Sequence, residues 1–333
     1  MVLVTGVTGL VGSHLALQLL ENNVCVRAIY RTTASMEKTK SIFRLYKKES
    51  LFEKIEWIQA DITDVPSLEV AFKNIEYVYH CAALISFDPK DEKQIRKINI
   101  EGTANVVNFC LGYGIKKLCH VSSIAALGDV KENENQISEE SEWNPELHHS
   151  DYAISKYGAE MEIWRGQQEG LETIVLNPGV IIGPFVKLRD WNQGSGLLFE
   201  KVTNGFPFYS KGTTGFIAVD DVIQIMIHLM KTEISNERFI LVGQNIVFKE
   251  LLDTIADALQ VKRPYIHANP FLINIAYKID WLIATVFGRK RKLNRSIVMA
   301  SYGKNLYSNK KLKSALGFEC IAIHGYIKKI SAL

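Results

Sequence analysis

The sequence predicts an α/β fold, with a doubly wound parallel sheet and a smaller, mainly helical domain beside it. Two observations lead to this prediction. The chain opens with an apolar run, a glycine-rich turn and an amphipathic helical pattern. Through the first half of its 333 residues, short apolar runs then alternate with helical patterns. Such alternation is typical of parallel strands joined by right-handed crossovers, with helices on both faces of the sheet.

The opening segment predicts a strand over residues 2–4, a tight turn and then a helix with leucines and alanines at helical spacing. Three glycines in the turn permit its bend, the approach of a pyrophosphate to the backbone, and close packing of helix on strand. The helix N-terminus offers free N–H groups and the positive end of a dipole to those phosphates. The order predicts a Rossmann dinucleotide site that comprises Gly6, Thr8, Gly9, Leu10, Val11 and Gly12.

Later strands are expected at residues 24–29, 55–59, 77–80, 118–121, 173–176 and 238–242, where the sequence is short, apolar and rich in β-branched or aromatic residues. Helical patterns cover 67–73, 99–111 and 152–166. The pattern loosens after about Pro184. We therefore assign residues 1–183 and about 216–243 to the Rossmann domain. About 184–215 and 244–333 form a substrate domain over the carboxyl ends of the strands, where ligands bind in such sheets.

The end of the second expected strand favours NADP over NAD. An NAD enzyme usually places an acidic residue about 20 residues after the glycines, where it binds the ribose 2′-hydroxyl. Here the chain has Arg31, followed by two threonines. A guanidinium can make charge-assisted, bidentate bonds to a 2′-phosphate. A solvated arginine at a strand end is the structural alternative, and NAD stays possible.

The catalytic prediction rests on Tyr152 and Lys156, whose spacing of four puts both side chains on one helical face. A free tyrosine has a pKa near 10, so it needs a nearby ammonium and an oxidised nicotinamide to act near neutral pH. Upstream, Ser122 and Ser123 end an expected strand and place a hydroxyl where it can hold a substrate oxygen. An exposed tyrosine and lysine on a helix is the alternative interpretation.

Taken together, these motifs resemble the extended short-chain dehydrogenase/reductase (NAD-dependent epimerase/dehydratase) family, and the match runs almost end to end. The motifs that carry it are residues 5–12, Asp61-Ile62, His80 to Ala83, Asn99 with Gly102-Thr103, Ser122-Ser123, Tyr152 with Lys156, Asn177 to Gly179, Gly183-Pro184 and residues 216–222.

The resemblance implies further cofactor contacts. Asp61 and Ile62 would contact the adenine, and Ala82 and Ala83 would line the phosphates and ribose. Tyr152 and Lys156 would also face the cofactor, with Lys156 on the nicotinamide ribose. The backbone of Pro178, Gly179 and Val180 would face the nicotinamide. Ser123 matches the family's catalytic hydroxyl better than Ser122, because it lies five residues before Gly128.

Within that family the chain is most similar to the dihydroflavonol reductase-like group. Arg31 and the tail from Tyr307 to Phe318 carry this likeness. Leu127 stands where sugar-nucleotide epimerases commonly have tyrosine, which weakens a nucleotide-sugar interpretation. We predict an NADP-dependent oxidoreductase for a small ketone or secondary alcohol. The alternatives are an epimerase or dehydratase with bound NAD(P), and a dinucleotide-binding sensor without turnover.

Composition and charge predict few other partners. A formal charge of +3, from 39 basic and 36 acidic residues, gives no general field for nucleic acid. The five cysteines are scattered, without metal-ligand spacing, and read as reduced thiols. The chain begins directly with its first strand, so we expect a cytoplasmic protein. By resemblance, a homodimer is possible.

Three features outside these motifs have structural interpretations. Asp220 and Asp221 are expected to cap the following helix and tie it to neighbouring backbone, not to bind a metal. Residues 271–287 are apolar but carry Lys278 and Asp280, so we expect a helix packed on the substrate domain and no transmembrane segment. Contact with a membrane surface, aided by the basic run at 289–292, is the minority interpretation. Aromatic residues expected to wall a pocket or lie in the core are Trp191, Phe199, Phe206, Phe208 and Tyr209.

Overall fold

A seven-stranded parallel sheet forms the first part of the molecule, with the strand order β10-β6-β5-β4-β1-β2-β3. The computed structural model describes residues 1–130, 134–184, 194–269, 271, 273–275, 277–280 and 302–333. The strands of this sheet are β1 (Val2–Thr5), β2 (Val26–Tyr30), β3 (Glu56–Gln59), β4 (Tyr77–His80), β5 (Lys117–Val121), β6 (Thr173–Pro178) and β10 (Glu237–Leu241). The central strands are buried on both faces, which is why they read as continuous apolar runs. The predicted doubly wound Rossmann sheet is confirmed.

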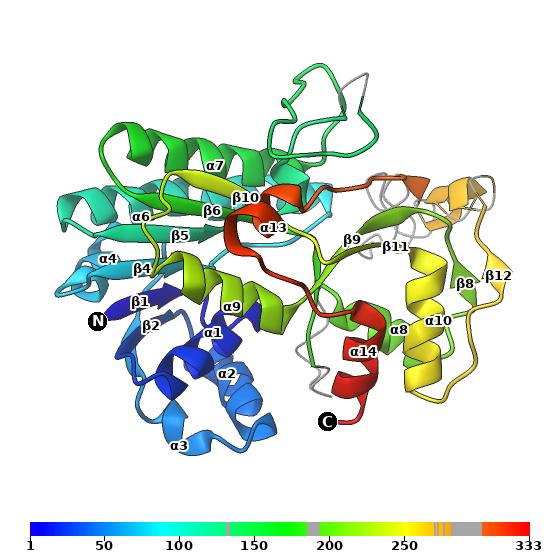
Figure 1. Ribbon diagram of the computed structural model, residues 1–333, viewed down its shortest axis with the longest axis horizontal. Helices are drawn as coiled ribbons and strands as arrows, with labels where there is room; N and C mark the ends of the chain where they lie inside the picture. The colour runs from blue at the N-terminus through cyan, green and yellow to red at the C-terminus, as the bar shows by residue number, and fades with distance from the viewer. Residues whose placement is uncertain (131–133, 185–193, 270, 272, 276, 281–301) are drawn as a thin grey trace.

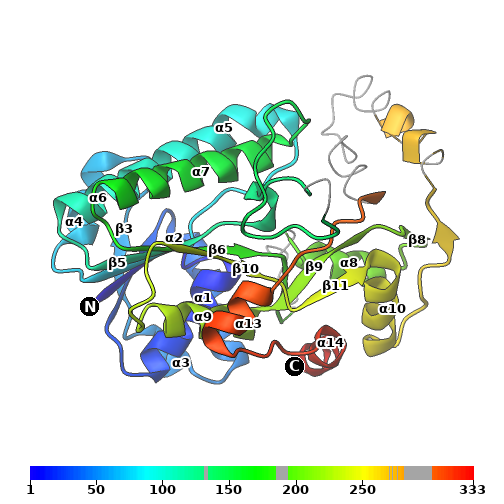
Figure 2. The same ribbon diagram turned by 45° about the horizontal axis from the view of Figure 1, so that its top comes forward.

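Helices cover both faces of this sheet (Figures 1 and 2). One layer, at the top of Figure 2, contains α4 (Val65–Phe72), α5 (Glu92–Arg96), the π-helical turn η2 (Lys97–Glu101), α6 (Gly102–Gly112) and α7 (Asp151–Gln168). The opposite layer contains α1 (Leu10–Glu21) and α9 (Val219–Leu229), with α2 (Thr33–Leu45), α3 (Glu49–Phe52) and α13 (Lys310–Leu316) around them. Each layer has its own apolar core against the sheet.

A second part of the molecule lies beyond the carboxyl ends of the strands (Figure 1). Its three-stranded sheet comprises β7 (Val180–Ile182), β9 (Thr213–Ala218) and β11 (Gln244–Val247), and its two-stranded sheet β8 (Phe208–Tyr209) and β12 (Ile266–His267). The helices described in this part include α8 (Gly196–Thr203), α10 (Phe248–Ala258) and α14 (Ile323–Ser331), and residues 273–275 and 277–280 are also helical. Short 3₁₀ turns, η1 (Pro89–Asp91) and η3 (Ile124–Ala126), follow β4 and β5. These two turns stand at the edge of the large sheet that faces the second part.

Candidate functional site

The glycine turn between β1 and α1 fits tightly against the end of β4. Gly6 has a left-handed φ of +68°, and a Cβ atom there would lie 2.5 Å from the amide nitrogen of Ala82. A Cβ at Gly12 would overlap the carbonyl oxygen of Gly6. Glycine is therefore required at both positions, and helix α1 begins at Leu10 with its N-terminus at this turn. A bare backbone turn at a helix N-terminus is the kind of cradle that a pyrophosphate fits.

The remaining predicted adenosine-side residues follow β2 and β3. Arg31 is exposed directly after β2, and its carbonyl oxygen accepts a hydrogen bond of 3.2 Å from Gln59 Nε2. Asp61 accepts two bonds of 2.8 Å, from the amide and the hydroxyl of Thr63, which fixes the turn after β3. Ile62 is buried and fills the space beside Gly102. The Asp61 carboxylate and the Arg31 guanidinium are thus the polar side chains of this group.

A buried histidine ties the end of β4 to its neighbours. His80 Nδ1 lies 2.7 Å from Thr5 Oγ1, and Nε2 lies 3.0 Å from Thr103 Oγ1. Burial lowers the pKa of His80 to about 3, so the imidazole is neutral. The Ala82 amide donates to the same Thr5 hydroxyl at 3.2 Å. These bonds fix the backbone that the glycine turn packs against.

Ser123, Tyr152 and Lys156 come together at the carboxyl end of β5. Helix α7 starts at Asp151, capped by Ser150, whose hydroxyl accepts from the Ala153 amide at 3.1 Å. Tyr152 is 9% exposed and hydrogen-bonds with Ser123. Lys156 is 1% exposed and donates to the Val121 carbonyl oxygen at 2.8 Å. The predicted serine, tyrosine and lysine therefore form one cluster, whereas the Ser122 hydroxyl is buried near Glu160 without the geometry of a hydrogen bond.

Burial dominates the electrostatics of this cluster. It raises the pKa of Tyr152 to about 12, although the hydrogen bond with Ser123 acts in the opposite direction. Burial also lowers the pKa of Lys156 to about 8, against the charges of Glu160 and Cys81, which raise it. Tyr152 is therefore a protonated phenol at neutral pH, and Lys156 stays largely an ammonium ion. That pair of states suits a proton donor beside a positive charge.

The segment after β6 lies behind the cluster. Asn177 donates to the Ser123 carbonyl oxygen at 2.9 Å, so β6 fixes the turn that carries the serine. Pro178 ends β6, Val180 begins β7, and the Gly179 amide between them donates to the Leu241 carbonyl oxygen at 3.0 Å. The backbone predicted to face a nicotinamide is thus held from two sides.

Sequence reasoning missed one charged group beside the cluster. Glu160 is fully buried and pairs with Arg238 of β10 at 3.3 Å. Its place one helical turn after Lys156 was visible in the sequence as a second spacing of four along α7. Arg238 comes from a strand 78 residues further along the chain, so no local pattern could have revealed the pair.

The expectation for Asp220 and Asp221 is half wrong. Ala218 stands at the N-cap of α9, and neither carboxylate caps the helix. Asp221 accepts instead from the Ile321 amide at 2.9 Å, and Asp220 accepts from the Tyr326 hydroxyl at 2.9 Å. The tie to neighbouring backbone is therefore present. Among the described residues, no group of three or more His, Cys, Asp or Glu side chains could hold a metal ion.

The other expected features lie partly outside the described residues. Trp191, residues 281–287 and the basic run at 289–292 are outside them. Phe199 is buried in α8, whereas Phe206 and Phe208 are each 39% exposed. Within the ranges that the structure covers, no helix is long and apolar enough to span a bilayer. The homodimer and the cytoplasmic location stay predictions.

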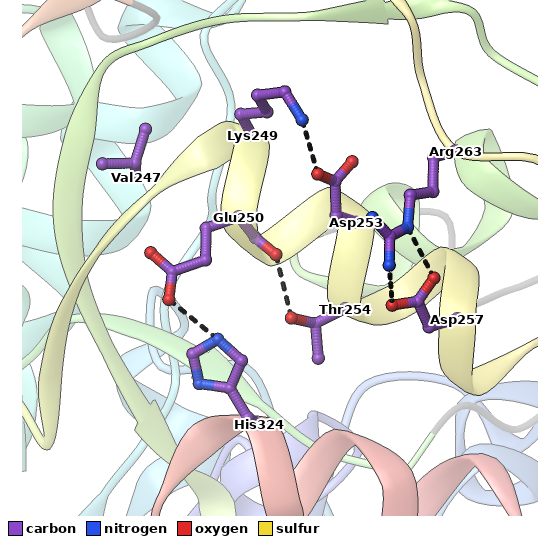
Figure 3. A pocket seen from close by; sticks show the side chains of 8 residues that line it. All are labelled: Val247, Lys249, Glu250, Asp253, Thr254, Asp257, Arg263 and His324. Carbon is purple, nitrogen blue, oxygen red and sulfur yellow. Dashed lines mark hydrogen bonds and ion pairs between the residues drawn. The ribbon is translucent and has the colours of Figure 1, made fainter.

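A cavity of about 440 Å³ is lined mainly by residues of α10, together with Arg263 and with His324 of α14 (Figure 3). Its charged side chains are paired with one another: Lys249 with Asp253 at 2.5 Å, Arg263 with Asp257 at 2.6 Å, and His324 with Glu250 at 2.9 Å. None of the residues predicted to carry the chemistry lines this cavity.

Comparison with protein families decides the class of the protein. The model of the NAD dependent epimerase/dehydratase family matches residues 2–243, from β1 to just beyond β10. The chain belongs to this family. It is accordingly an NAD(P)-dependent enzyme of the extended short-chain dehydrogenase/reductase type, as the glycine turn and the Tyr152 motif predicted.

Members similar to this chain include reductases and epimerases. A putative dihydroflavonol 4-reductase from Synechocystis is 26% identical over 346 residues, which cover 98% of this chain and 95% of that protein. The crystal structure of gox2253 superposes with a TM-score of 0.81 at 25% identity, over 100% of this chain and 97% of the other. UDP-glucose 4-epimerase from Thermotoga maritima gives a TM-score of 0.77 at 21% identity, over 99% and 97% of the two chains. The last likeness is one of fold alone.

Proposed function

We propose that this family member is an NADP-dependent oxidoreductase that reduces a ketone, or oxidises a secondary alcohol, of a small organic substrate. The observation that carries the proposal is the buried cluster at the end of β5, in which Tyr152 hydrogen-bonds with Ser123 and lies one helical turn before Lys156. The cluster lies next to the glycine turn. Lys156 is close enough to Cys81 for its charge to lower the pKa of that thiol, and the Cys81 backbone packs against Gly6.

Each of the three side chains has one role in this proposal. Ser123 donates a hydrogen bond that orients the carbonyl oxygen of the substrate. Tyr152 transfers its phenolic proton to that oxygen as the carbonyl carbon accepts hydride, and the product is the secondary alcohol. Lys156 stabilises the phenolate that remains until a proton returns from solvent. A bound nicotinamide supplies the hydride. The turn at Gly6, Gly9 and Gly12 would hold its pyrophosphate, with Asp61, Ala82, Ala83 and the Pro178–Val180 backbone along the rest of the cofactor.

The substrate side of Tyr152 is apolar. Phe87 packs edge-on against the Tyr152 ring, with 5.5 Å between the ring centroids, and is 44% exposed. Ile85 of the same loop is 42% exposed. Leu127, at the position where an epimerase commonly has tyrosine, is buried and apolar. An apolar ketone fits these surroundings better than a nucleotide sugar does.

The first test is Tyr152→Phe, which removes the transferred proton and keeps the ring. We expect kcat for NADPH-dependent carbonyl reduction to fall about 10²-fold or more, the scale of a lost general acid. The dissociation constant for NADPH should stay within about twofold. Tyr157→Phe, on the same helix, is the matched control and should leave kcat unchanged. Turnover retained by Tyr152→Phe would defeat the assignment of the proton donor.

The second test concerns the cofactor. If Arg31 binds the 2′-phosphate, the wild type should bind NADPH more tightly than NADH. Arg31→Ala should then weaken NADPH binding about tenfold or more, the worth of one charge-assisted hydrogen bond, and leave NADH binding unchanged. Arg44→Ala removes an exposed arginine of α2, paired with Glu37, and serves as control. Equal binding of both cofactors by the wild type, measured by titration, would favour NAD.

The second candidate function is a nucleotide-sugar epimerase or dehydratase, favoured by the fold shared with UDP-glucose 4-epimerase. Such an enzyme regenerates its nicotinamide in each cycle, whereas a reductase consumes added NADPH in proportion to product. A metabolite screen followed by NADPH absorbance separates the two. Interconversion of a UDP-sugar without net NADPH consumption would replace the proposed reductase with the epimerase. Tight NADPH binding without turnover of any substrate would indicate the dinucleotide-binding sensor.

A further inference from the structure

Glu160 is a buried carboxylate that the proposed reaction does not use. It is 0% exposed and lies on the inner face of α7, four residues after Lys156 and eight after Tyr152. Residues at these spacings share one face of a helix. A carboxylate in such a position costs free energy unless hydrogen bonds and an opposite charge compensate it. The structure supplies both kinds of compensation.

Asn177 connects Glu160 to the serine of the cluster. Its Nδ2 group donates to Glu160 Oε1 at 2.5 Å and to the Ser123 carbonyl oxygen at 2.9 Å. An amide group has only two protons to donate, so both are used here. The carboxylate therefore fixes the orientation of the amide that holds the Ser123 turn.

Arg238 connects Glu160 to the last strand of the large sheet. Its Nη1 lies 3.3 Å from Glu160 Oε2, and its Nη2 donates to the carbonyl oxygen of Glu139. Glu139 Oε1 in turn accepts from the Ile240 amide of β10 at 2.8 Å. Because Arg238 is held by strand β10 and by the 138–141 loop, it keeps the carboxylate in one place from the side opposite to Asn177.

We infer that Glu160 is a positioning residue, which holds Ser123 through Asn177 and keeps Lys156 of the same helix charged. The inference rests on the proposed function and concerns the same site. Glu160 touches neither substrate nor cofactor in it. Arg238 and Asn177 hold the Glu160 carboxylate in place. The carboxylate in turn orients the Ser123 turn and keeps the Lys156 ammonium charged.

The charged and titratable groups around Lys156 show why Glu160 matters. On the sheet side, the neutral imidazoles of His80 and His120 face it, and the loop after β4 contributes the Cys81 thiol. The charge of Glu160 is the largest influence that raises the pKa of Lys156, and it opposes burial, which lowers this pKa to about 8. Burial raises the pKa of Glu160 itself, and Ser122, Arg238 and Asn177 lower it. Without the carboxylate, Lys156 should lose its proton nearer to neutral pH.

The experiment is Glu160→Gln, which keeps an acceptor for Asn177 and removes the charge. We expect the alkaline limb of the kcat profile for carbonyl reduction to move to lower pH by about one unit, so that kcat falls about fivefold at pH 8 and little at pH 6. Glu162→Gln, on the same helix and paired with Arg165, is the matched control and should leave the profile unchanged. An equal loss of kcat at every pH, without movement of the limb, would overturn the inference.

A readout that needs no turnover separates this inference from the proposed function. In protein labelled with ¹³C at the lysine Cε positions, the Lys156 signal is assigned as the one missing from Lys156→Met. Its titration midpoint should fall in Glu160→Gln and stay near the wild-type value in Glu160→Asp, which keeps the charge. An unchanged midpoint in Glu160→Gln would defeat the inference even if the enzyme proves active. If Glu160→Gln does not fold, Glu160→Asp provides the test. Because it keeps the charge, the alkaline limb of its kcat profile should stay at the wild-type pH. A shift of this limb by about one unit would count against the inference. A wild type that reduces no carbonyl compound would defeat only the proposed function.

Discussion

Lys156 illustrates, at the scale of one residue, how a buried charge lowers the stability of the folded protein. Its ammonium is 1% exposed, and burial lowers its pKa from 10.5 to about 8. The unfolded chain therefore binds this proton more tightly than the folded chain does. Between pH 8 and 10.5 the unfolded state holds more protons, so the free energy of unfolding rises with pH over this range. Below pH 8 the lysine is charged in both states, and the free energy of unfolding is lowered by the full cost of burying that charge.

Lys156→Met should remove this pH dependence. Relative to the variant, the wild type should gain up to about 3 kcal/mol in the free energy of unfolding as pH rises from 7 to 10.5, at about 1.4 kcal/mol per pKa unit. Urea unfolding at several pH values measures the free energy of unfolding of both proteins. Groups that titrate in both proteins contribute equally, so their effect cancels in the difference. The exposed Lys93→Met is the control and should track the wild type. Parallel curves for wild type and Lys156→Met would show that the folded protein does not lower the pKa of Lys156.

Local spacing made much of the candidate site predictable. Tyr152 and Lys156 lie four residues apart on one helix, and Ser123 follows a strand whose apolar sequence is plain. Glu160 shares the same spacing, but a glutamate on a helix is usually solvated, and its burial depends on Arg238 from the far edge of the sheet. A charge pair between distant segments leaves no mark on either segment alone. That is why sequence reasoning found the three residues of the proposed site and missed Glu160 behind them.

At the scale of elements, the strands of the large sheet were predictable because they are buried on both faces. The strand expected at residues 77–80 is β4 with those bounds. The strand expected from residue 24 begins only at Val26, because the Val24 amide still bonds back to the end of α1, at the Leu19 carbonyl oxygen. This hydrogen bond joins residues five apart at a helix C-terminus, and it moves the strand boundary without changing the apolar pattern.

The two small sheets were not anticipated. Strand β7 has three residues and β8 has two, too few for an alternating pattern to show. Strand β9 pairs with β7 and β11, each about 30 residues away along the chain. Their identity as strands depends on these long-range partners and not on local preference. The loosened pattern after Pro184 therefore gave no sign of β8 and β9, and β7 lies just before it.

At the scale of the whole molecule, the chain passes between the large sheet and the second part through a junction rich in glycine. Gly179 separates β6 from β7, and Gly243 separates β10 from β11, with its amide donating to the Phe216 carbonyl oxygen at 2.9 Å. Gly215 of β9 packs against Val242. In Figures 1 and 2, β9 and β11 lie between the large sheet and helix α10. We propose this junction as the boundary between the Rossmann and substrate domains, close to the boundaries expected at residues 183, 216 and 243.

Gly179→Ala tests whether close packing at this junction fixes the position of the second part relative to the large sheet. A Cβ there would overlap the Gly215 carbonyl oxygen, a backbone atom that cannot turn aside as a flexible side chain can. We expect the free energy of unfolding to fall by about 1–3 kcal/mol, the usual cost of overpacking. We also expect kcat/KM to fall by more than tenfold, because the Pro178–Val180 backbone and the second part of the molecule would both shift relative to Tyr152. Gly112→Ala, at the open end of α6 with no atom within 4 Å of the added methyl group, should keep wild-type activity and gain slightly in stability. Equal behaviour of the two variants would mean that the junction tolerates displacement, and that the alignment of the parts depends on contacts elsewhere.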